Sequence, residues 1–501
     1  MRWLYERWSG RLLIGMVAFV VVMGMQLPDL QASGQLAHIL TQGEIMKALK
    51  WPLLFGLLSI VATMAWSHNE AQAEEKQAQE VALLQARQHK EREKLEEAKA
   101  AQHGFAAQVV GLQWLNPLMR RSYPTEWNLL WTLGLAKPNK NDELVKENPA
   151  KFNTIQPVSG IAFNMQGKAT IPGFFHLYVE ELFIKYRVPY FTDGRYFYTV
   201  QPDWKRNWRE VGSIHVQAAL PVTLEADESR DFIQKEIAST FSIGKPEMST
   251  AKAPPDVNVR QGGPTIGFAS LDAALDYLET HPDKTVWVMS FDAPSFPKDE
   301  QLNESSTLLI LAHPSYKTER EPLAFIHRVS RRQADEFTVQ AAEPPRLQQA
   351  WQAAINDAAQ RGKLQTTQIG YVIHDAGMGL EENSKRLAGL SAALMHAMPE
   401  FDYLKQTFNT PALLGDMGAG TALTNVALGI AYAHHRNTPV LVAGTAQAGS
   451  ATAVLIRPPQ NPTPFDPEKT WFRARGEGVA YLPWWGRRHD ASPTRMQGWS
   501  D

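Results

Sequence analysis

The chain has 501 residues, more than the ~100–200 residues of a usual single domain, so we expect several structural parts. Its formal net charge of -2 gives no reason to expect nucleic-acid binding. The complete absence of cysteine excludes disulfides, thiolate metal ligands and cysteine nucleophiles.

Two apolar runs occupy the N-terminal part of the chain. The first, Leu12–Leu27, reads LLIGMVAFVVVMGMQL, and the second, Trp51–Trp66, begins and ends with tryptophan, which favours the membrane interface. A transmembrane helix needs ~20 residues, and flanking residues can extend both runs to that length. We expect two transmembrane helices within residues 1–67. The first run could instead be a cleaved signal peptide, and either run could be a buried core helix.

Basic residues predict the orientation of these helices. Arginines precede the first run and a Lys/Arg-rich segment follows the second, whereas the loop between them holds only Lys47 and Lys50. Because cytoplasmic flanks carry the excess of Lys and Arg, both ends are expected in the cytoplasm. The sequence therefore predicts a multi-pass protein of the bacterial inner membrane with a cytoplasmic soluble domain.

A charged segment, residues 68–103, follows the second run. It is rich in Ala, Gln, Glu and Lys and contains no Gly or Pro, which favours a helix. Its apolar positions are too sparse for a coiled-coil seam. We expect a solvated helical stalk.

Residues 104–460 are predicted to form one soluble α/β domain with halves at about 155–330 and 345–460, followed by a tail at 461–501. A helix is expected at 174–186, strands at 196–200 and 214–220, and a loop or hinge at 245–264, which is rich in Pro, Gly and Lys. Helices and strands then alternate. The expected helices are 271–278, 347–359, 382–396 and 419–435, and the expected strands are 286–289, 308–312, 323–327, 369–373, 440–443 and 451–456.

Three short motifs have both a chemical and a structural interpretation. His374 and Asp375 could form an acid/base pair at a strand end, but a turn with Asp375 capping backbone amides is favoured. The segment Gly415–Gly420 could cradle a phosphate, although Asp416 repels anions and a tight turn before the helix is favoured. The pair His434–His435 has no partner at metal-ligand spacing, so a solvated helix end is expected. We predict no metal and no cofactor.

Two segments combine tryptophan with arginine, a composition typical of interaction hot spots. We expect partner binding at one of them, although the first could be an exposed strand–loop edge and the second a packed tail. The predicted binding residues are Trp204, Arg206, Trp208, Arg209, Trp484, Trp485, Arg487 and Arg488.

Three segments resemble the thiolase-like fold of the β-ketoacyl synthases. Ser270–Leu278, followed by the strand Val286–Met289 and by Asp292 at a turn, resembles the helix and strand after the synthase nucleophile. Tyr371–Gly377 resembles a strand ending in a His-Gly-Thr motif, and Gly415–Gly420 resembles a Gly-His-x-x-Gly-Ala loop. The resemblance covers about residues 155–460 and implies a thiolase-like layered fold.

The departures from this pattern bear on activity. Synthase chemistry needs a cysteine thiolate, which is absent, and Asp416 stands where a histidine is expected, so only His374 remains. Ser270 has no base placed beside it by sequence. The resemblance therefore implies a pseudoenzyme. The alternative is a divergent enzyme for acyl transfer or hydrolysis that uses Ser270, His374, Asp375 and Asp416.

The whole layout resembles the family of type VI secretion lipase adaptors. Two spans, a helical stalk, the Asp416 glycine loop and the hairpin Ala443–Pro458 carry this resemblance. It implies a membrane-anchored, non-catalytic adaptor that binds a phospholipase effector and helps to load it onto the secretion spike protein. A purely structural membrane protein, in which the stalk sets the distance from the bilayer, is a third possibility.

Overall fold

The fold is described here from a computed structural model, which divides into the compact units 1–101 and 102–501. The described residues are 15–17, 20–21, 54, 57–58, 61, 104–116, 125–135, 158–159, 170–192, 214–244, 252–293, 303–317, 322–338, 343–377, 379, 381–462 and 486–487. Apart from a few helical residues, the two predicted spans lie outside this set, as does the predicted stalk. Within the described part of the chain, we find no helix with the length and apolar character that crossing a membrane requires.

The main structural feature of the second unit is one large sheet. Among the described residues it holds eleven strands in the order β10-β9-β11-β12-β7-β1-β6-β5-β3-β4, with β8 paired to β12. Its strands are β1 (Ala106–Leu115), β3 (Ile214–Leu220), β4 (Asp256–Gln261), β5 (Thr285–Asp292), β6 (Ser305–Ala312), β7 (Phe325–His327), β8 (Ser330–Gln333), β9 (Tyr371–His374), β10 (Thr407–Asn409), β11 (Val440–Gly444) and β12 (Ser450–Arg457). A separate pair joins β2 (Val158–Ser159) to β13 (Gly486–Arg487).

Helices cover both faces of this sheet. They are α4 (Thr125–Thr132), α6 (Ile171–Thr192), α7 (Ala226–Thr240), α8 (Ile266–Thr280), α9 (Arg346–Arg361), α10 (Glu381–Ala397), α11 (Tyr403–Gln406), α12 (Thr410–Leu414) and α13 (Thr421–Arg436). Short 3₁₀ turns are η5 (Ala334–Glu336), η6 (Thr366–Gln368) and η7 (Gly418–Gly420). The predicted α/β class is confirmed.

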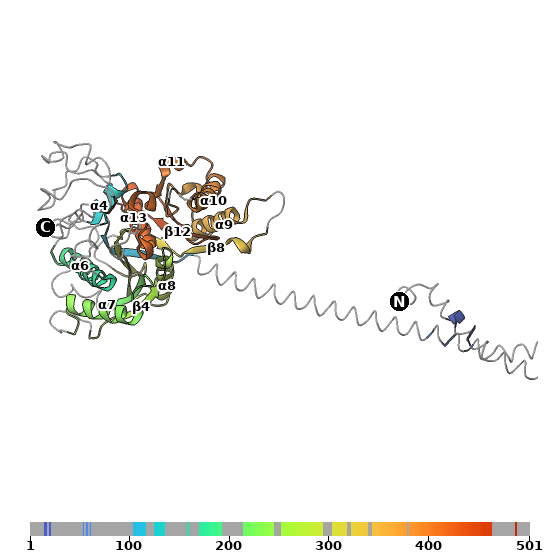
Figure 1. Ribbon diagram of the computed structural model, residues 1–501, viewed down its shortest axis with the longest axis horizontal. Helices are drawn as coiled ribbons and strands as arrows, with labels where there is room; N and C mark the ends of the chain where they lie inside the picture. The colour runs from blue at the N-terminus through green and yellow to red at the C-terminus, as the bar shows by residue number, and fades with distance from the viewer. Residues whose placement is uncertain are drawn as a thin grey trace, which may run out of the picture. The chain divides into compact units, whose positions relative to one another are not determined.

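The strand order repeats. In the first half, β3 lies between the parallel strands β4 and β5, and β5 pairs antiparallel with β6. In the second half, β9 lies between the parallel strands β10 and β11, and β11 pairs antiparallel with β12. Strands β1 and β7 join β6 to β12, so the two equivalent halves form one continuous sheet. Figure 1 shows the two halves as neighbouring groups in green and orange.

Two central helices form the contact between the halves. Helix α8 of the first half packs against α13 of the second, and nearly all residues of α13 are buried. Gly267 lies at this crossing, because a Cβ atom there would come within 3.0 Å of the Ala422 Cβ. Burial on nearly every side explains why α13 is mostly apolar, with small polar residues such as Thr424 buried as well.

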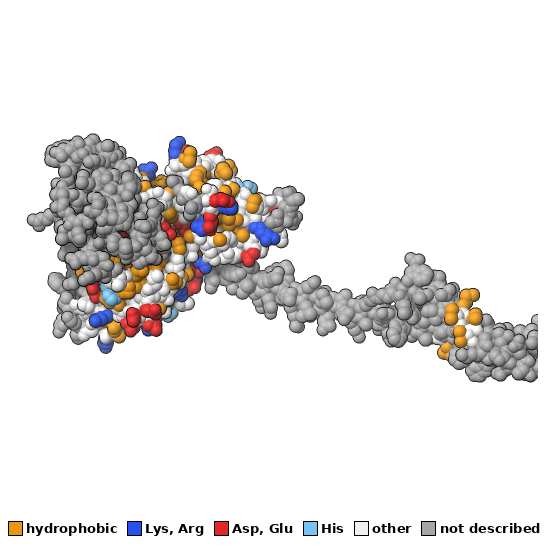
Figure 2. All heavy atoms as spheres, in the orientation of Figure 1, with side chains coloured by type: hydrophobic (Ala, Val, Ile, Leu, Met, Phe, Trp, Pro, Cys, Tyr) orange, Lys and Arg blue, Asp and Glu red, His pale blue; other side chains and the backbone are white. Residues whose placement is uncertain are grey.

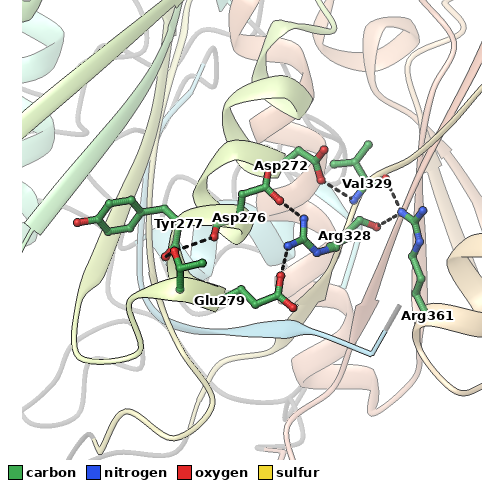
Figure 3. A network of polar contacts seen from close by, with 8 residues as sticks. Asp272, Asp276, Tyr277, Glu279, Arg328, Val329 and Arg361 are labelled. Atoms are coloured by element: carbon green, nitrogen blue, oxygen red, sulfur yellow. Dashed lines mark hydrogen bonds and ion pairs between the residues drawn. The ribbon is translucent and has the colours of Figure 1, made fainter. Parts of the chain in front are cut away.

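A partly buried polar network also joins the two halves (Figure 3). The Arg328 guanidinium, whose side chain is 10% exposed, forms ion pairs with Asp276 and Glu279 on α8. Arg361 at the end of α9 donates to the backbone carbonyls of residues 328 and 329. The Val329 N–H donates to the Asp272 carboxylate at 3.3 Å. These contacts tie the segment between β7 and β8 to α8 and α9, while the Nε atoms of Arg328 and Arg361 have no hydrogen-bond partner among the described residues.

Several expectations need correction or extension. The segment 245–264, expected to be a loop, contains strand β4, in which Val257 packs into the core while its neighbours face outward. The expected helices and strands between 271 and 456 are present with slightly different ends. Strands β1, β8 and β10 and helices α4 and α7 were not expected. Strand β8 and helix α7 are rich in polar residues, whereas β1 is apolar apart from two glutamines and carries a strand pattern that was missed. The strand expected at 196–200 lies outside the described residues.

Candidate functional site

His374 and Asp375, the expected acid/base pair, lie at the carboxyl end of β9. The His374 side chain is 1% exposed. Its Nδ1 accepts from the Ala376 N–H at 3.3 Å, and its Nε2 lies 3.1 Å from the Tyr403 hydroxyl. Burial lowers the pKa of His374 to about 4, so the imidazole is neutral at pH 7. Both ring nitrogens are engaged within the protein, which leaves no free position for a substrate proton.

Asp375 points to a different partner. Its Oδ1 accepts from the backbone N–H and the hydroxyl of Thr445, at the turn of the β11–β12 hairpin. Its Oδ2 is buried without a hydrogen-bond partner among the described residues. Burial raises the pKa of Asp375 above its ordinary value. Asp375 therefore caps a backbone amide and ties β9 to the hairpin, as the structural interpretation predicted.

The glycine loop before α13 is a tight turn. Gly415 and Gly418 have φ of 79° and 50°, a backbone conformation that favours glycine. The exposed Asp416 accepts at Oδ1 from the Gly418 N–H at 2.9 Å, which closes the turn. Asn303, which precedes β6, donates to the carbonyls of residues 414 and 416 and fixes the loop against the first half.

A buried carboxylate that the sequence did not reveal occupies the amino end of this helix. Asp292, the last residue of β5, accepts at Oδ2 from the Ala419 N–H at 2.8 Å and at Oδ1 from the Ala293 N–H at 2.8 Å. Burial raises the pKa of Asp292 to about 7. The Ala419 N–H, in the η7 turn that precedes α13, is thus already bound to a carboxyl group from the other half.

Ser270, the candidate nucleophile of the alternative enzyme, lies inside α8 and is fully buried. Its Oγ has no hydrogen-bond partner among the described residues. A serine nucleophile needs a base within hydrogen-bond reach, and no such contact is present there. No hydrogen bond joins any two of the four candidate catalytic residues, which are His374, Asp375, Asp416 and Ser270, within the described part of the chain.

His434 and His435 do not form the solvated helix end that we expected. Their exposed fractions are 4% and 6%. His434 donates from Nδ1 to the Leu323 carbonyl at 2.8 Å, and His435 Nε2 lies 3.2 Å from the Glu126 carboxylate on α4. Burial lowers the pKa of His434 to about 4. Helix α4 covers this end of α13, and sequence spacing alone carries no sign of that contact.

Two hollows open on the described surface of the second half. One, of about 410 Å³, is lined by Thr367, Ile369, Met398, Pro399, Glu400, Phe401 and Gln406. The other, of about 670 Å³, is lined by Gln360, Lys363, Leu364, Gln365 and Gln368. Neither lining includes Ser270, His374, Asp375 or Asp416.

The two predicted binding patches lie outside the described residues. This holds for the whole segment 204–209 and for Trp484, Trp485 and Arg488. At Arg487 the structure describes the backbone, which pairs with Ser159 in the short strand pair. Partner binding through these patches stays a prediction.

The chain has distant likenesses to solved ketosynthases. An oxazolomycin ketosynthase domain from Streptomyces albus is 12% identical with a TM-score of 0.44, and the match covers 74% of this chain and 100% of that chain. The ketosynthase from module 6 of the bacillaene synthase of Bacillus subtilis is 11% identical with a TM-score of 0.45, covering 70% and 71%. Likenesses at these TM-scores carry no conclusion about chemistry. No curated protein matches the chain in sequence.

A family model matches the second half of the unit 102–501. The matched segment begins two residues before β7 and ends one residue after β12, so it contains His374, Asp375 and the Asp416 loop. Residues 323–458 match the family described as the C-terminal part of the type VI lipase adapter protein Tla3, which confirms the adaptor resemblance seen in the sequence.

Proposed function

We propose that the protein is a non-catalytic adaptor that binds a type VI lipase effector and helps to load it onto the secretion spike. The observation that carries this proposal is the family match over residues 323–458. An adaptor needs a stable folded surface and no reacting groups. The continuous sheet and the buried helices α8 and α13 supply such a rigid body.

The residues that stand where the synthases have catalytic groups, His374, Asp375 and the Asp416 loop, are termed the remnant site. Their chemistry supports the non-catalytic part of the proposal. The chain has no cysteine to form an acyl-enzyme. The Ala419 amide in the η7 turn before α13 is bound by Asp292, and the negative side chain of Asp416 lies two residues before that turn. A developing oxyanion would meet negative charge there instead of free donors.

The proposal includes a thiolase-like origin for the fold. The repeated order of strands in the two halves and the packing of α8 on α13 support it. In this view the chain keeps a scaffold of two repeated halves and has lost the groups that carried out acyl transfer.

The proposal also includes anchoring to the inner membrane, with the soluble unit in the cytoplasm. Its support is the pair of apolar runs 12–27 and 51–66 with basic residues on their outer flanks. Extraction that requires detergent, together with a cytoplasmic signal from reporter fusions after Trp66, would support it. Extraction in buffer alone, or a periplasmic signal, would contradict it.

Affinity capture of the tagged full-length protein from detergent-solubilised native membranes tests the adaptor role. We expect a type VI lipase effector among the captured proteins, identified by mass spectrometry and absent from an untagged strain. The variant Asp416→His serves as a matched control, because it alters the remnant site and should capture the effector equally well. Turnover of acyl thioesters by the wild-type protein, without effector capture, would contradict the proposal.

A further inference from the structure

A shallow hollow with a mixed apolar and polar lining lies at the start of β9, away from the remnant site. Its floor includes Ile369 and Met398, both 3% exposed, and Phe401 forms part of its wall. Its volume of about 410 Å³ falls at the small end of the ~300–1,000 Å³ usual for binding pockets. A hollow of this size and lining suits apolar side chains of a protein partner. It lies wholly within the segment that matches the adaptor family.

A prominent exposed side chain stands beside this hollow. Leu404 on α11 is 91% exposed, the largest exposed fraction among the large hydrophobic residues that the structure describes. Phe401 and Gln406, which line the hollow, flank it in sequence. In Figure 2, hydrophobic side chains lie among basic and acidic ones over the region of α11. Met395, 59% exposed at the end of α10, adds further apolar surface.

The backbone that carries Leu404 is held rigidly. The Asp402 carboxylate accepts from the N–H groups of Leu404 at 3.1 Å and Lys405 at 3.3 Å. The Gln406 side chain accepts from the Asp402 N–H at 2.7 Å and donates to the Gly370 carbonyl at 3.1 Å. Because these bonds fix the loop before any partner arrives, little ordering entropy opposes docking there.

The charge at the rim indicates the chemistry of the partner. Glu400 lines the hollow and is exposed, and it forms no ion pair within the described part of the chain. The nearby Lys405 is engaged with Asp402 at 3.1 Å. An approaching segment therefore meets an apolar floor beside an unpaired carboxylate. The complement is an apolar anchor next to a lysine or arginine.

We propose that the hollow lined by Ile369, Met398 and Phe401, with Leu404 and Glu400 at its rim, docks a segment of the lipase effector that carries an apolar side chain next to a basic one. This inference rests on the proposed adaptor function and names the surface that performs it. The effector's apolar side chain fills the hollow, Leu404 packs against the same segment, and Glu400 pairs with its cation.

The test measures binding of full-length variants to the purified type VI lipase effector that the affinity capture identifies. Leu404→Asp and Glu400→Lys should each weaken binding about tenfold or more, as expected for anchors in an interface. Glu400→Gln should weaken it less than Glu400→Lys, because it removes the attraction without adding repulsion. Val222→Asp is the matched control: Val222 is 73% exposed in the first half and should bind like the wild type. Thermal melts should be unchanged, because all four changes lie at exposed positions.

Three outcomes would overturn the inference in distinguishable ways. Binding within twofold of wild type for both Leu404→Asp and Glu400→Lys would leave the adaptor function standing and remove this surface. Failure of the wild-type protein to bind the effector would remove the adaptor function and the surface with it. A dimer of wild-type chains that Leu404→Asp converts to monomers, with effector binding intact, would assign the hollow to a second copy.

Discussion

Replacing the buried Asp292 by asparagine tests the electrostatics at the centre of the molecule. In the wild-type protein, this carboxylate binds the Ala419 and Ala293 amides, each at 2.8 Å. Asparagine offers one acceptor oxygen, and its NH₂ group faces the other amide. That loss costs about 1–3 kcal/mol at low and at high pH, because a buried N–H is left facing the NH₂ group, whereas the carboxylate and the protonated carboxyl both keep an oxygen lone pair towards each amide.

A second effect depends on pH and has the opposite sign. Burial raises the pKa of Asp292 from 3.8 to about 7 in the folded state, so folding favours the protonated form. Its contribution to stability is therefore present below pH 3.8 and is lost as the pH rises towards 7. Since each pH unit over this window is worth about 1.36 kcal/mol, the loss between pH 4 and pH 8 is about 4 kcal/mol. The Asp292→Asn variant, whose amide does not titrate, would carry no such loss.

The two effects predict that the stability order of the proteins reverses with pH. At pH 4 the wild type should be more stable than Asp292→Asn by about 1–3 kcal/mol. At pH 8 the variant should be more stable, because the stability difference has moved by about 4 kcal/mol. Urea denaturation followed by tryptophan fluorescence measures both values. Asp227→Asn, at a side chain that is 84% exposed, is the control: it makes the same chemical change outside the core and should not reverse the stability order. If the free energies of unfolding of the wild type and of Asp292→Asn differed by the same amount at pH 4 and at pH 8, the reasoning would be refuted.

Three further predictions concern packing, acid stability and activity. Gly267→Val should destabilise the protein by about 2 kcal/mol or more in urea, because its side chain enters the α8–α13 crossing, whereas Gly263→Ala, with no atom within 4 Å of the added Cβ, should not. As the pH falls from 6.5 to 4, the free energy of unfolding of His374→Gln should decrease by about 3 kcal/mol less than that of the wild type. The reason is that the folded wild type holds a neutral imidazole with a pKa of about 4. Equal decreases for the two proteins would contradict this. The wild-type protein and Asp416→His should both show no condensation of acyl and malonyl thioesters in a product assay, and measurable turnover by either would contradict the pseudoenzyme interpretation.

The parts of the fold that could be predicted are those whose signal lies within one segment. The hairpin of β11 and β12 is an apolar pair of strands around a short polar turn, and its sequence indicates this directly. Strand β4 escaped detection because DVNVRQ at a sheet edge buries few side chains and lies among Pro, Gly and Lys. Edge strands carry a weaker hydrophobic pattern than central ones.

The candidate site was less predictable because long-range contacts define it. Asp292 caps an amide 127 residues away in the chain, so no local window reveals its role. His435 likewise meets Glu126 on α4, far away in sequence. In contrast, the capping role of Asp375 followed from its place at a strand end, where short polar side chains commonly bind backbone amides.

The measurement that tests the central claim most directly is secretion of the lipase effector by a strain that lacks this chain. The adaptor account predicts that the effector accumulates inside the cells, and that wild-type protein and Asp416→His restore its secretion equally while other type VI effectors leave normally. Normal secretion of the lipase without this chain would contradict the account.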